Sequence, residues 1–253
     1  MELNNRQKKV VEATEPYILC LASAASGKAL PNSTIIPTLC GPKPVGDIKI
    51  GDYLFDRNGK PTQVLGVYPQ GELEVYELTL GDGRKAKCSK EHIWSVNKTT
   101  WKDRNSFREM TVEEILNSSL INSSRGANFY IPCSQAVEYP EKEYKIHPYI
   151  IGAFLGDGCC KEHQLTISSE DDVIPSHIAD LLGNAQTKRR HENNYSWSFS
   201  NANGKIYTDI LPKELVCYSY EKRIPYEYKY GSIEQRYELI RGLMDTDGSI
   251  SKD

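Results

Sequence analysis

The sequence predicts a mostly β domain followed by a mixed α/β domain, with a short helix and strand in front of them. Three observations lead to this fold class. Residues 29–140 contain short runs of β-branched and aromatic residues separated by turn-forming dipeptides. After Pro140, patterns typical of helices and of strands alternate. Residues 5–15 are rich in helix formers and lead into a short apolar run. The predicted parts are residues 1–28, 29–140 and 141–253.

The first part ends in a segment with the pattern of a phosphate-binding loop. In "ILCLASAASGK", an apolar strand runs into a loop that ends at Gly27 and Lys28, where backbone N–H groups and an ammonium group can hold phosphate. The next residue of such a loop is Ser or Thr, whose hydroxyl binds the magnesium ion of the nucleotide, but Ala29 has no side-chain oxygen. Pro31 also opposes the helix that normally follows. The pattern is therefore interrupted after its lysine.

The same 28 residues resemble the start of a superfamily-one helicase. In that family the glutamine of an "NxxQ" motif, here Gln7, contacts adenine. The resemblance implies that Gln7, Gly27 and Lys28 bind ATP in an ATP-dependent DNA helicase. A helicase ATPase fragment is accordingly one interpretation of the chain, and the missing hydroxyl at Ala29 speaks against it.

The second part is predicted to consist of short β-hairpins. Two dipeptides typical of hairpin tips, Asn58 with Gly59 and Asp82 with Gly83, lie between the β-type runs. These runs are "GDIKIGDYLFD", "QVLGVYPQ", "EVYELTL" and "KAKCSKEHIWSV". One amphipathic helix is expected in "MTVEEILNSS", with Thr111 as its N-cap.

The third part contains two similar helical segments, "HPYIIGAFLGDG" and "SIEQRYELIRGLMDTDG". In the first, Gly152 and Gly156 are four residues apart and so lie on one helix face. Gly242 and Thr246 repeat this spacing in the second. Because small residues leave room for a neighbouring backbone, the two helices are predicted to pack closely against each other.

Each helical segment ends in Asp followed by Gly, which places Asp157 and Asp247 at helix C-terminal ends. The glycine after each aspartate is expected to turn the chain away from the helix. A carboxylate at the negative end of a helix dipole is unfavourable by a few tenths of a kcal/mol to about 1 kcal/mol. A divalent cation held between the two aspartates would relieve this repulsion.

Composition narrows the possible compartments and partners. No apolar run approaches the roughly 18 residues of a membrane span, and the N-terminus lacks a signal-peptide core, so we expect an intracellular, cytoplasmic protein with no membrane partner. The seven cysteines form no CxxC pair, which favours reduced thiols. At a net charge of -3, DNA binding needs a local basic patch, for which "TKRR" (residues 187–190) is the candidate.

From Ala29 onward the chain resembles an intein that carries a LAGLIDADG homing endonuclease. "ALPNSTIIPTLCGPKPVGDIKIGDYLFD" is similar to the N-terminal splicing block, and "GDGRKAKCSKEHIWSV" to the block that contains a histidine, here His92. "IIGAFLGDG" and "IRGLMDTDG" resemble the paired endonuclease motifs, with "KRIP" as the short block between them. The resemblance implies a horseshoe-shaped Hint splicing domain followed by an incomplete α/β endonuclease, in a prokaryotic or phage host.

For the endonuclease, the resemblance implies a magnesium ion held by Asp157 and Asp247, with Lys222 near the cleaved bond. The substrate would be double-stranded DNA, the host gene without the insertion. Strands beside the helices would contact it, so the basic side chains of the "TKRR" run become candidate DNA contacts. These are Lys188, Arg189 and Arg190.

For splicing, the resemblance implies that His92 protonates or polarises the amide nitrogen at the junction between Lys28 and Ala29. In the family a threonine three residues before the histidine assists this step, and Cys88 is assigned its place, although a thiol is a poorer donor to an oxyanion. Trp94 stands two residues after the histidine, as in the third mechanistic class of inteins. Splicing itself needs no cofactor.

Most inteins begin with a cysteine or serine nucleophile, which Ala29 cannot replace. Two explanations stay open: an engineered substitution, or a third-class intein whose nucleophile is an internal cysteine of a later block. The resemblance further implies that this block and about half of the nuclease are not among these residues, so splicing would need a C-terminal segment or a split partner chain. A catalytically silent remnant is the remaining alternative.

Overall fold

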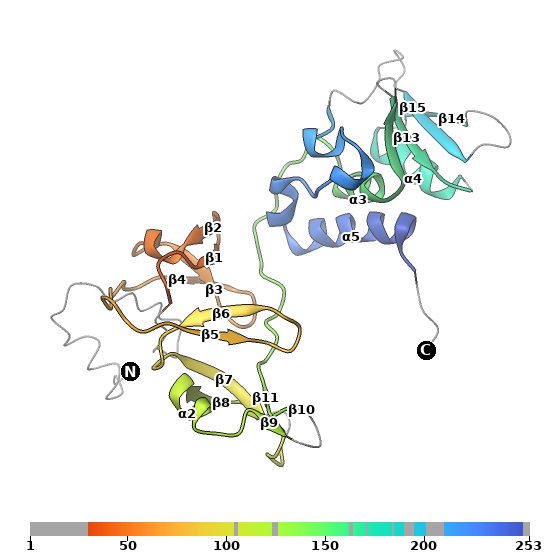
Figure 1. Cartoon of the computed structure of the whole chain (residues 1–253). Coiled ribbons are helices and arrows are strands. Elements are labelled where there is room, and N and C mark those ends of the chain that lie inside the picture. Colours follow the sequence, from red (N-terminus) through yellow and green to blue (C-terminus); the bar gives the residue numbers. More distant parts are fainter. Residues whose placement is uncertain are drawn as a thin grey trace. The chain divides into compact units, whose positions relative to one another are not determined.

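The computed structural model describes most of the chain after residue 29, and none of the helices it describes is long and apolar enough to cross a membrane. The described residues are 30–103, 106–122, 126–161, 164–170, 172–183, 185–189, 195–200 and 210–249. They form two compact units that divide between Glu138 and Tyr139 (Figure 1). The expected N-terminal helix and strand lie outside the described residues, as do Gln7, Gly27, Lys28, Ala29 and Arg190.

The first unit is mostly β, as predicted (Figure 1). Its strands pair into small antiparallel sheets, β1 with β2, β3 with β4, β5 with β6, β9 with β10, and three strands in the order β11-β7-β8. The strands are β1 (Ile35–Thr38), β2 (Gly41–Pro44), β3 (Tyr53–Phe55), β4 (Pro61–Gln63), β5 (Tyr76–Thr79), β6 (Lys85–Cys88), β7 (Ile93–Lys98), β8 (Arg108–Thr111), β9 (Ile121–Asn122), β10 (Gly126–Ala127) and β11 (Phe129–Tyr130).

The two predicted hairpin tips are confirmed. Gly59 (φ 80°) lies between β3 and β4, and Gly83 (φ 84°) lies between β5 and β6. Both glycines adopt the left-handed conformation that other residues avoid, which explains their place in these turns.

A short helix, α2 (Val112–Leu116), follows β8. The predicted cap is confirmed, because the Thr111 hydroxyl accepts a hydrogen bond from the Glu114 N–H while the Glu114 carboxylate accepts one from the Thr111 N–H. A separate small core of Val45, Ile48 and Val64 packs against partly buried residues that include Leu30.

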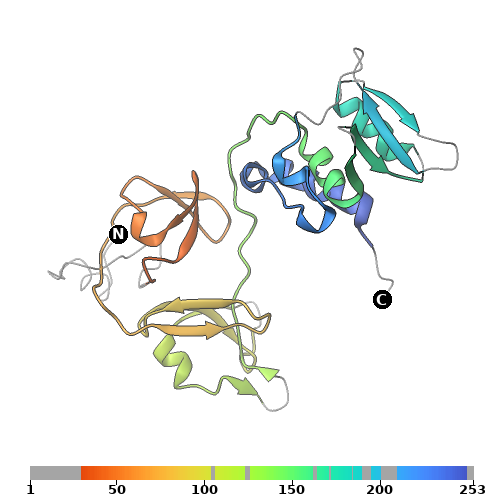
Figure 2. The ribbon, with the colours of Figure 1, turned by 45° about the horizontal axis from the view of Figure 1, so that its top comes forward.

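The second unit combines helices with one four-stranded antiparallel sheet in the order β12-β13-β15-β14 (Figure 2). Its core joins α3, the sheet and α4 through Phe154, Ile167, Ile178 and Phe199. The elements are α3 (Pro148–Asp157), β12 (Gly158–Lys161), β13 (Gln164–Ser168), α4 (Val173–Leu181), β14 (Gln186–Arg189), β15 (Ser196–Ser200), the 3-10 turns η3 (Lys213–Leu215), η4 (Ser219–Glu221) and η5 (Tyr226–Tyr230), and α5 (Ile233–Asp247).

The predicted close packing of the two similar helices is confirmed. A Cβ atom added to Gly152 on α3 would overlap the Leu239 carbonyl oxygen of α5, and one added to Gly242 on α5 would overlap the Tyr149 carbonyl oxygen of α3. The two backbones therefore touch directly, which only glycine allows at these positions.

The outer faces of the two helices differ in burial. Ile150 and Phe154 of α3 are fully buried, whereas the residues at the same places in the repeated motif, Ile240 and Met244 of α5, are 53% and 50% exposed. The sheet and α4 cover α3, and no described element covers this face of α5.

Candidate functional sites

The first candidate site surrounds His92, at the turn between β6 and β7. The His92 N–H donates to the Ser89 carbonyl oxygen at 3.1 Å, and the His92 carbonyl accepts from the Val112 N–H at 3.1 Å. The imidazole is 5% exposed, and its centroid lies 5.3 Å from that of the Trp94 ring. The chain therefore holds both rings in fixed positions inside the first unit.

Two hydrogen-bond donors of this site are buried without a partner among the described residues. These are the Ser89 hydroxyl and the indole N–H of Trp94. A buried donor left unsatisfied costs roughly 1–3 kcal/mol. The Ser89 hydroxyl is therefore placed to bind an acceptor that the described part of the chain does not supply, whereas the Trp94 indole has the Cys88 thiol beside it as a weak acceptor.

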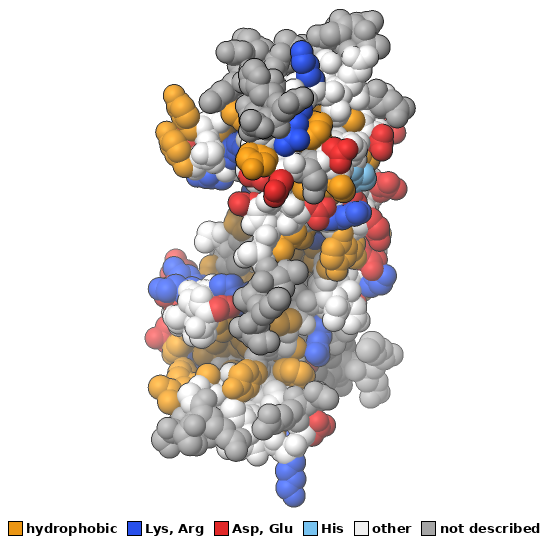
Figure 3. Space-filling view, turned by 90° about the vertical axis from the view of Figure 1, so that its right-hand side faces the viewer, with side chains coloured by type: hydrophobic (Ala, Val, Ile, Leu, Met, Phe, Trp, Pro, Cys, Tyr) orange, Lys and Arg blue, Asp and Glu red, His pale blue; other side chains and the backbone are white. Residues whose placement is uncertain are grey.

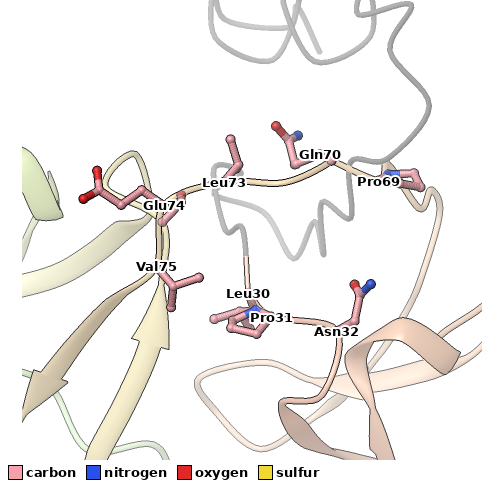
Figure 4. A pocket seen from close by; sticks show the side chains of 10 residues that line it. Leu30, Pro31, Asn32, Pro69, Gln70, Leu73, Glu74 and Val75 are labelled. Carbon is pink, nitrogen blue, oxygen red and sulfur yellow. The ribbon is translucent and has the colours of Figure 1, made fainter.

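Ser89 also lines a cavity of about 160 Å³. Figure 4 shows Leu30, Pro31 and Asn32 on one side of it, and the connection from Pro69 to Val75 on the other. Leu30 follows the predicted junction residue Ala29 directly. The cavity thus has Ser89 and the start of the predicted insertion in its lining.

Cys88 is fully buried, and burial raises the pKa of its thiol; the neighbouring Trp94 side chain opposes this only in part. A buried neutral thiol is a poor nucleophile and a weak donor. The residue three positions before His92 is Ser89, not Cys88. Ser89 therefore occupies the position of the assisting threonine in the family pattern, and the assignment of that position to Cys88 was wrong. The spacing in "CSKEH" already identifies Ser89.

The second candidate site lies where α3 and α5 end. A Cβ atom added to Gly156 would lie 3.1 Å from the Asp247 Cβ, so the C-terminal ends of the two helices meet. Burial raises the pKa of the Asp157 carboxyl above its usual value, the charge of Asp247 raises it further, and the Lys222 ammonium lowers it in part. The two carboxylates thus share one small region and repel each other.

This pair suits a hard divalent cation. Carboxylate oxygens are the ligands that magnesium prefers, and magnesium keeps several waters or substrate oxygens in addition to one or two protein carboxylates. The described residues hold no cluster of three or more His, Cys, Asp or Glu side chains around a metal position. Asp157 and Asp247 therefore fit a cation that shares its remaining ligands with water and a phosphate.

Lys222 contacts the end of α3. Its ammonium donates to the carbonyl oxygens of Phe154, at 2.9 Å, and Gly158, and lies 4.9 Å from the centre of the Phe154 ring. These two carbonyls lie on either side of Asp157 in the chain. Lys222 thus neutralises the negative end of the helix and fixes the backbone that carries the carboxylate.

The glycines after the two aspartates end the helices, as expected. Gly158 has φ -76° and ψ 147°, and Gly248 has φ -75° and ψ 145°, so both leave the helix in an extended conformation and not in the left-handed one. Glycine is needed for space instead, because an added Cβ would overlap the Phe154 ring and the Met244 carbonyl, respectively. The two helices end in the same way.

The basic run on β14 is not a single patch. Lys188 and Arg189 are consecutive on a strand and therefore project from opposite faces of the sheet. The Arg189 guanidinium lies 5.4 Å from the Trp197 ring and donates to the Glu170 carbonyl at 3.3 Å. Acidic and basic side chains are interspersed on the face shown in Figure 3.

No family model matches this chain. A protein of Mycobacterium intracellulare named replicative DNA helicase DnaB is 27% identical over 258 residues, which cover 92% of this chain and 40% of that protein. The chain thus spans less than half the length of this relative.

Two solved structures of the gp41-1 intein are also similar in part. One is 26% identical, and the match covers 44% of this chain and 83% of the gp41-1 chain, with a TM-score of 0.30. A substituted form is 25% identical and covers 45% and 83%, with the same TM-score. A TM-score of 0.30 does not identify a fold, so the horseshoe shape and the endonuclease fold stay predictions.

The structure therefore groups the predicted site residues into two clusters and leaves others apart. The first cluster contains Cys88, His92 and Trp94, to which Ser89 is added. The second contains Asp157, Lys222 and Asp247. Lys188 and Arg189 belong to neither cluster.

Proposed function

We propose that this chain functions in protein splicing, as an insertion in an ATP-dependent DNA helicase, and that the peptide bond between Lys28 and Ala29 is its N-terminal junction. The observation that carries the proposal is the cavity shared by Leu30 and Ser89, whose buried hydroxyl has no partner among the described residues. Because consecutive Cα atoms lie about 3.8 Å apart, covalent geometry keeps the junction close to Leu30.

In this proposal His92 is the general acid at the junction. Its imidazole gives a proton to the amide nitrogen of Ala29 as that nitrogen leaves, while the Ser89 hydroxyl donates to the oxyanion that develops on the Lys28 carbonyl. Ala29 supplies no nucleophile, and Cys88 is buried and neutral. In this proposal the attacking group is the internal cysteine of a later splicing block, as the resemblance to third-class inteins implies.

The comparisons support the helicase as host. The relative is named a replicative DNA helicase, and the matched 92% of this chain is longer than either unit, so the similarity includes residues of both. The phosphate-binding pattern that stops at Lys28 agrees with such a host. The finer superfamily-one class stays a prediction from the first 28 residues.

The test is to express the chain together with the residues encoded after Asp253 in its gene. Mass spectrometry of the products should show a peptide in which "SGK" is joined to a new residue, with residues 29–253 removed. His92→Ala and Ser89→Ala should both slow the appearance of this peptide. If no ligation and no cleavage after Lys28 occur under any conditions, the proposal is wrong.

A second activity, DNA phosphodiester hydrolysis, is favoured by the carboxylate pair at the matched ends of α3 and α5. Asp157 and Asp247 would hold magnesium, which supplies an activated water and stabilises the leaving oxygen when it is bound. Lys222 keeps the end of α3 in place through the carbonyls of Phe154 and Gly158. The DNA substrate is the helicase gene without the insertion.

This activity is tested by incubating the chain, joined to the C-terminal segment that the resemblance implies, with magnesium and a plasmid that carries the uninterrupted helicase gene. Asp157→Asn and Asp247→Asn should abolish cleavage. Asp245→Asn is the matched control, because its amide oxygen can still accept the hydrogen bond that Tyr149 donates to Asp245 at 2.8 Å. Cleavage that persists in the first two variants would refute the assignment.

A further inference from the structure

Two tyrosines at η4 in the second unit are far more exposed than aromatic side chains usually are. Tyr218 and Tyr220 are 72% and 74% exposed. Their rings are parallel to within 3°, with centroids 5.7 Å apart. The pair is an offset stack that presents aromatic surface to solvent.

The turn that carries the rings is held in place from both sides. The Glu221 N–H donates to the Tyr218 carbonyl at 2.9 Å, and the Arg223 guanidinium donates to the Tyr220 carbonyl at 3.1 Å. Before the turn, Leu215 is fully buried in the core. The backbone that carries the rings is therefore held in place, which lowers the entropy lost when a ligand binds.

The turn is also attached to the carboxylate site. Lys222, two residues after Tyr220, donates to the carbonyls of Phe154 and Gly158 at the end of α3. Two residues span at most about 7 Å. The aromatic pair therefore belongs to the turn whose Lys222 reaches the end of α3 that bears Asp157.

The surroundings of the rings suit nucleic acid better than a protein partner. The neighbouring residues in the turn are Ser219, Glu221, Lys222 and Arg223, whereas the centre of a protein interface is depleted of charged residues. Exposed aromatic faces are the usual means by which proteins stack unpaired bases. The charged groups of Lys222 and Arg223 hold backbone carbonyls here, so the rings themselves supply the contact surface.

We propose that Tyr218 and Tyr220 form a stacking platform for a nucleobase of the DNA strand next to the cleaved bond. The inference rests on the proposed nuclease activity and adds a base contact to it. Such a contact requires one base to leave its stack, as happens when proteins kink DNA. The platform carries little sequence information, because every base has an aromatic face.

The experiment measures binding of the chain, joined to the same C-terminal segment as in the cleavage test, to a fluorescent duplex that contains the uninterrupted helicase sequence, by anisotropy, in calcium to prevent cleavage. The double variant with Tyr218→Ala and Tyr220→Ala should bind about tenfold more weakly or worse. The variant with Phe at both positions keeps the rings and should bind as the unsubstituted chain does. Tyr237→Ala, at a residue that is 65% exposed on α5, is the matched control.

A second measurement separates stacking from a loss of charge contacts. The slope of affinity against salt concentration should be the same in the double alanine variant as in the unsubstituted chain, because no phosphate contact is removed. With 2-aminopurine at the central base pairs, its fluorescence should fall on binding to the unsubstituted chain and stay higher with the double alanine variant.

The possible failures are distinct. If the unsubstituted chain does not bind the duplex, the nuclease proposal itself is wrong. If it binds and the double alanine variant binds equally well, the platform does not exist. Unchanged DNA binding together with altered sedimentation of the variant would assign the rings to a protein contact, which also overturns the inference.

Discussion

Gly152 lies so close to Leu239 that one added methyl group would overlap the Leu239 carbonyl oxygen. Gly152→Ala should therefore force α3 and α5 apart and destabilise the second unit by about 1–3 kcal/mol or more. Urea unfolding followed by circular dichroism measures this. Gly81→Ala, where an added Cβ meets nothing within 4 Å, should change stability by less than about 0.5 kcal/mol. Equal effects would contradict the direct backbone contact.

Ile150 and Ile240 occupy the same place in the repeated motif but differ in burial, at 0% and 53% exposed. Ile150→Ala should lower the free energy of unfolding by about 2–5 kcal/mol, since it opens a cavity in the core. Ile240→Ala should lower it by less than about 0.5 kcal/mol in this chain. Thermal unfolding of the two variants under the same conditions measures this. Equal losses of stability would contradict the exposure of Ile240 on α5.

The ionised Asp157 carboxylate is unfavourable in the folded chain, because burial and Asp247 raise its pKa. When the pKa of a carboxyl is higher in the folded than in the unfolded state, the folded chain loses stability as the pH rises. The loss begins near the pKa of the unfolded state, about 3.9, and is complete above the pKa of the folded state. Asp157→Asn should therefore raise the melting temperature at neutral pH while removing nuclease activity. This gain should shrink as the pH falls into the range where Asp157 is protonated. A lower melting temperature of the variant at pH 7 would argue against the repulsion.

His147 makes the stability of the second unit depend on pH in the direction opposite to Asp157. Its Nδ1 accepts a hydrogen bond from the Tyr149 N–H at 3.3 Å at the start of α3. Burial lowers the pKa of this imidazole, Glu238 raises it in part, and His177 lowers it. Its contribution to stability is therefore present above the unfolded value of about 6.5 and is lost as the pH falls through the folded pKa.

We expect the free energy of unfolding to fall between pH 7 and pH 5, and His147→Asn, which keeps a side-chain acceptor at the N-cap, to remove part of this slope. Urea unfolding at a series of pH values measures it. His177→Asn tests the neighbouring ring, which lies with its centroid 4.5 Å from that of Tyr149. A slope unchanged in the His147 variant would show that other groups cause the acid sensitivity.

Local patterns predicted the parts of the fold that local chemistry determines. The hairpin tips at Gly59 and Gly83 and the cap at Thr111 depend on a few neighbouring residues, and all three are confirmed. The helix contact through Gly152 and Gly242 was also predictable, because the repeated spacing of small residues marks a face with room for a neighbour.

Features set by distant parts of the chain were not predictable in this way. The contacts of Lys222 with the Phe154 and Gly158 carbonyls join segments more than sixty positions apart in the sequence. The separation of Lys188 from Arg189 follows from the strand that they share, whereas "TKRR" read as a basic loop suggested a common patch. The cavity beside Ser89 depends on the connection at residues 69–75, which carries no motif.

The two aspartates at the helix ends are ninety positions apart, at 157 and 247. While the ribosome is still adding the residues between them, Asp157 has no second carboxylate beside it. Even afterwards the pair exists only once α5 has docked on α3. In the proposed nuclease, a chain that has not reached Asp247, or in which α5 has not docked on α3, therefore lacks the second carboxylate of the cation site.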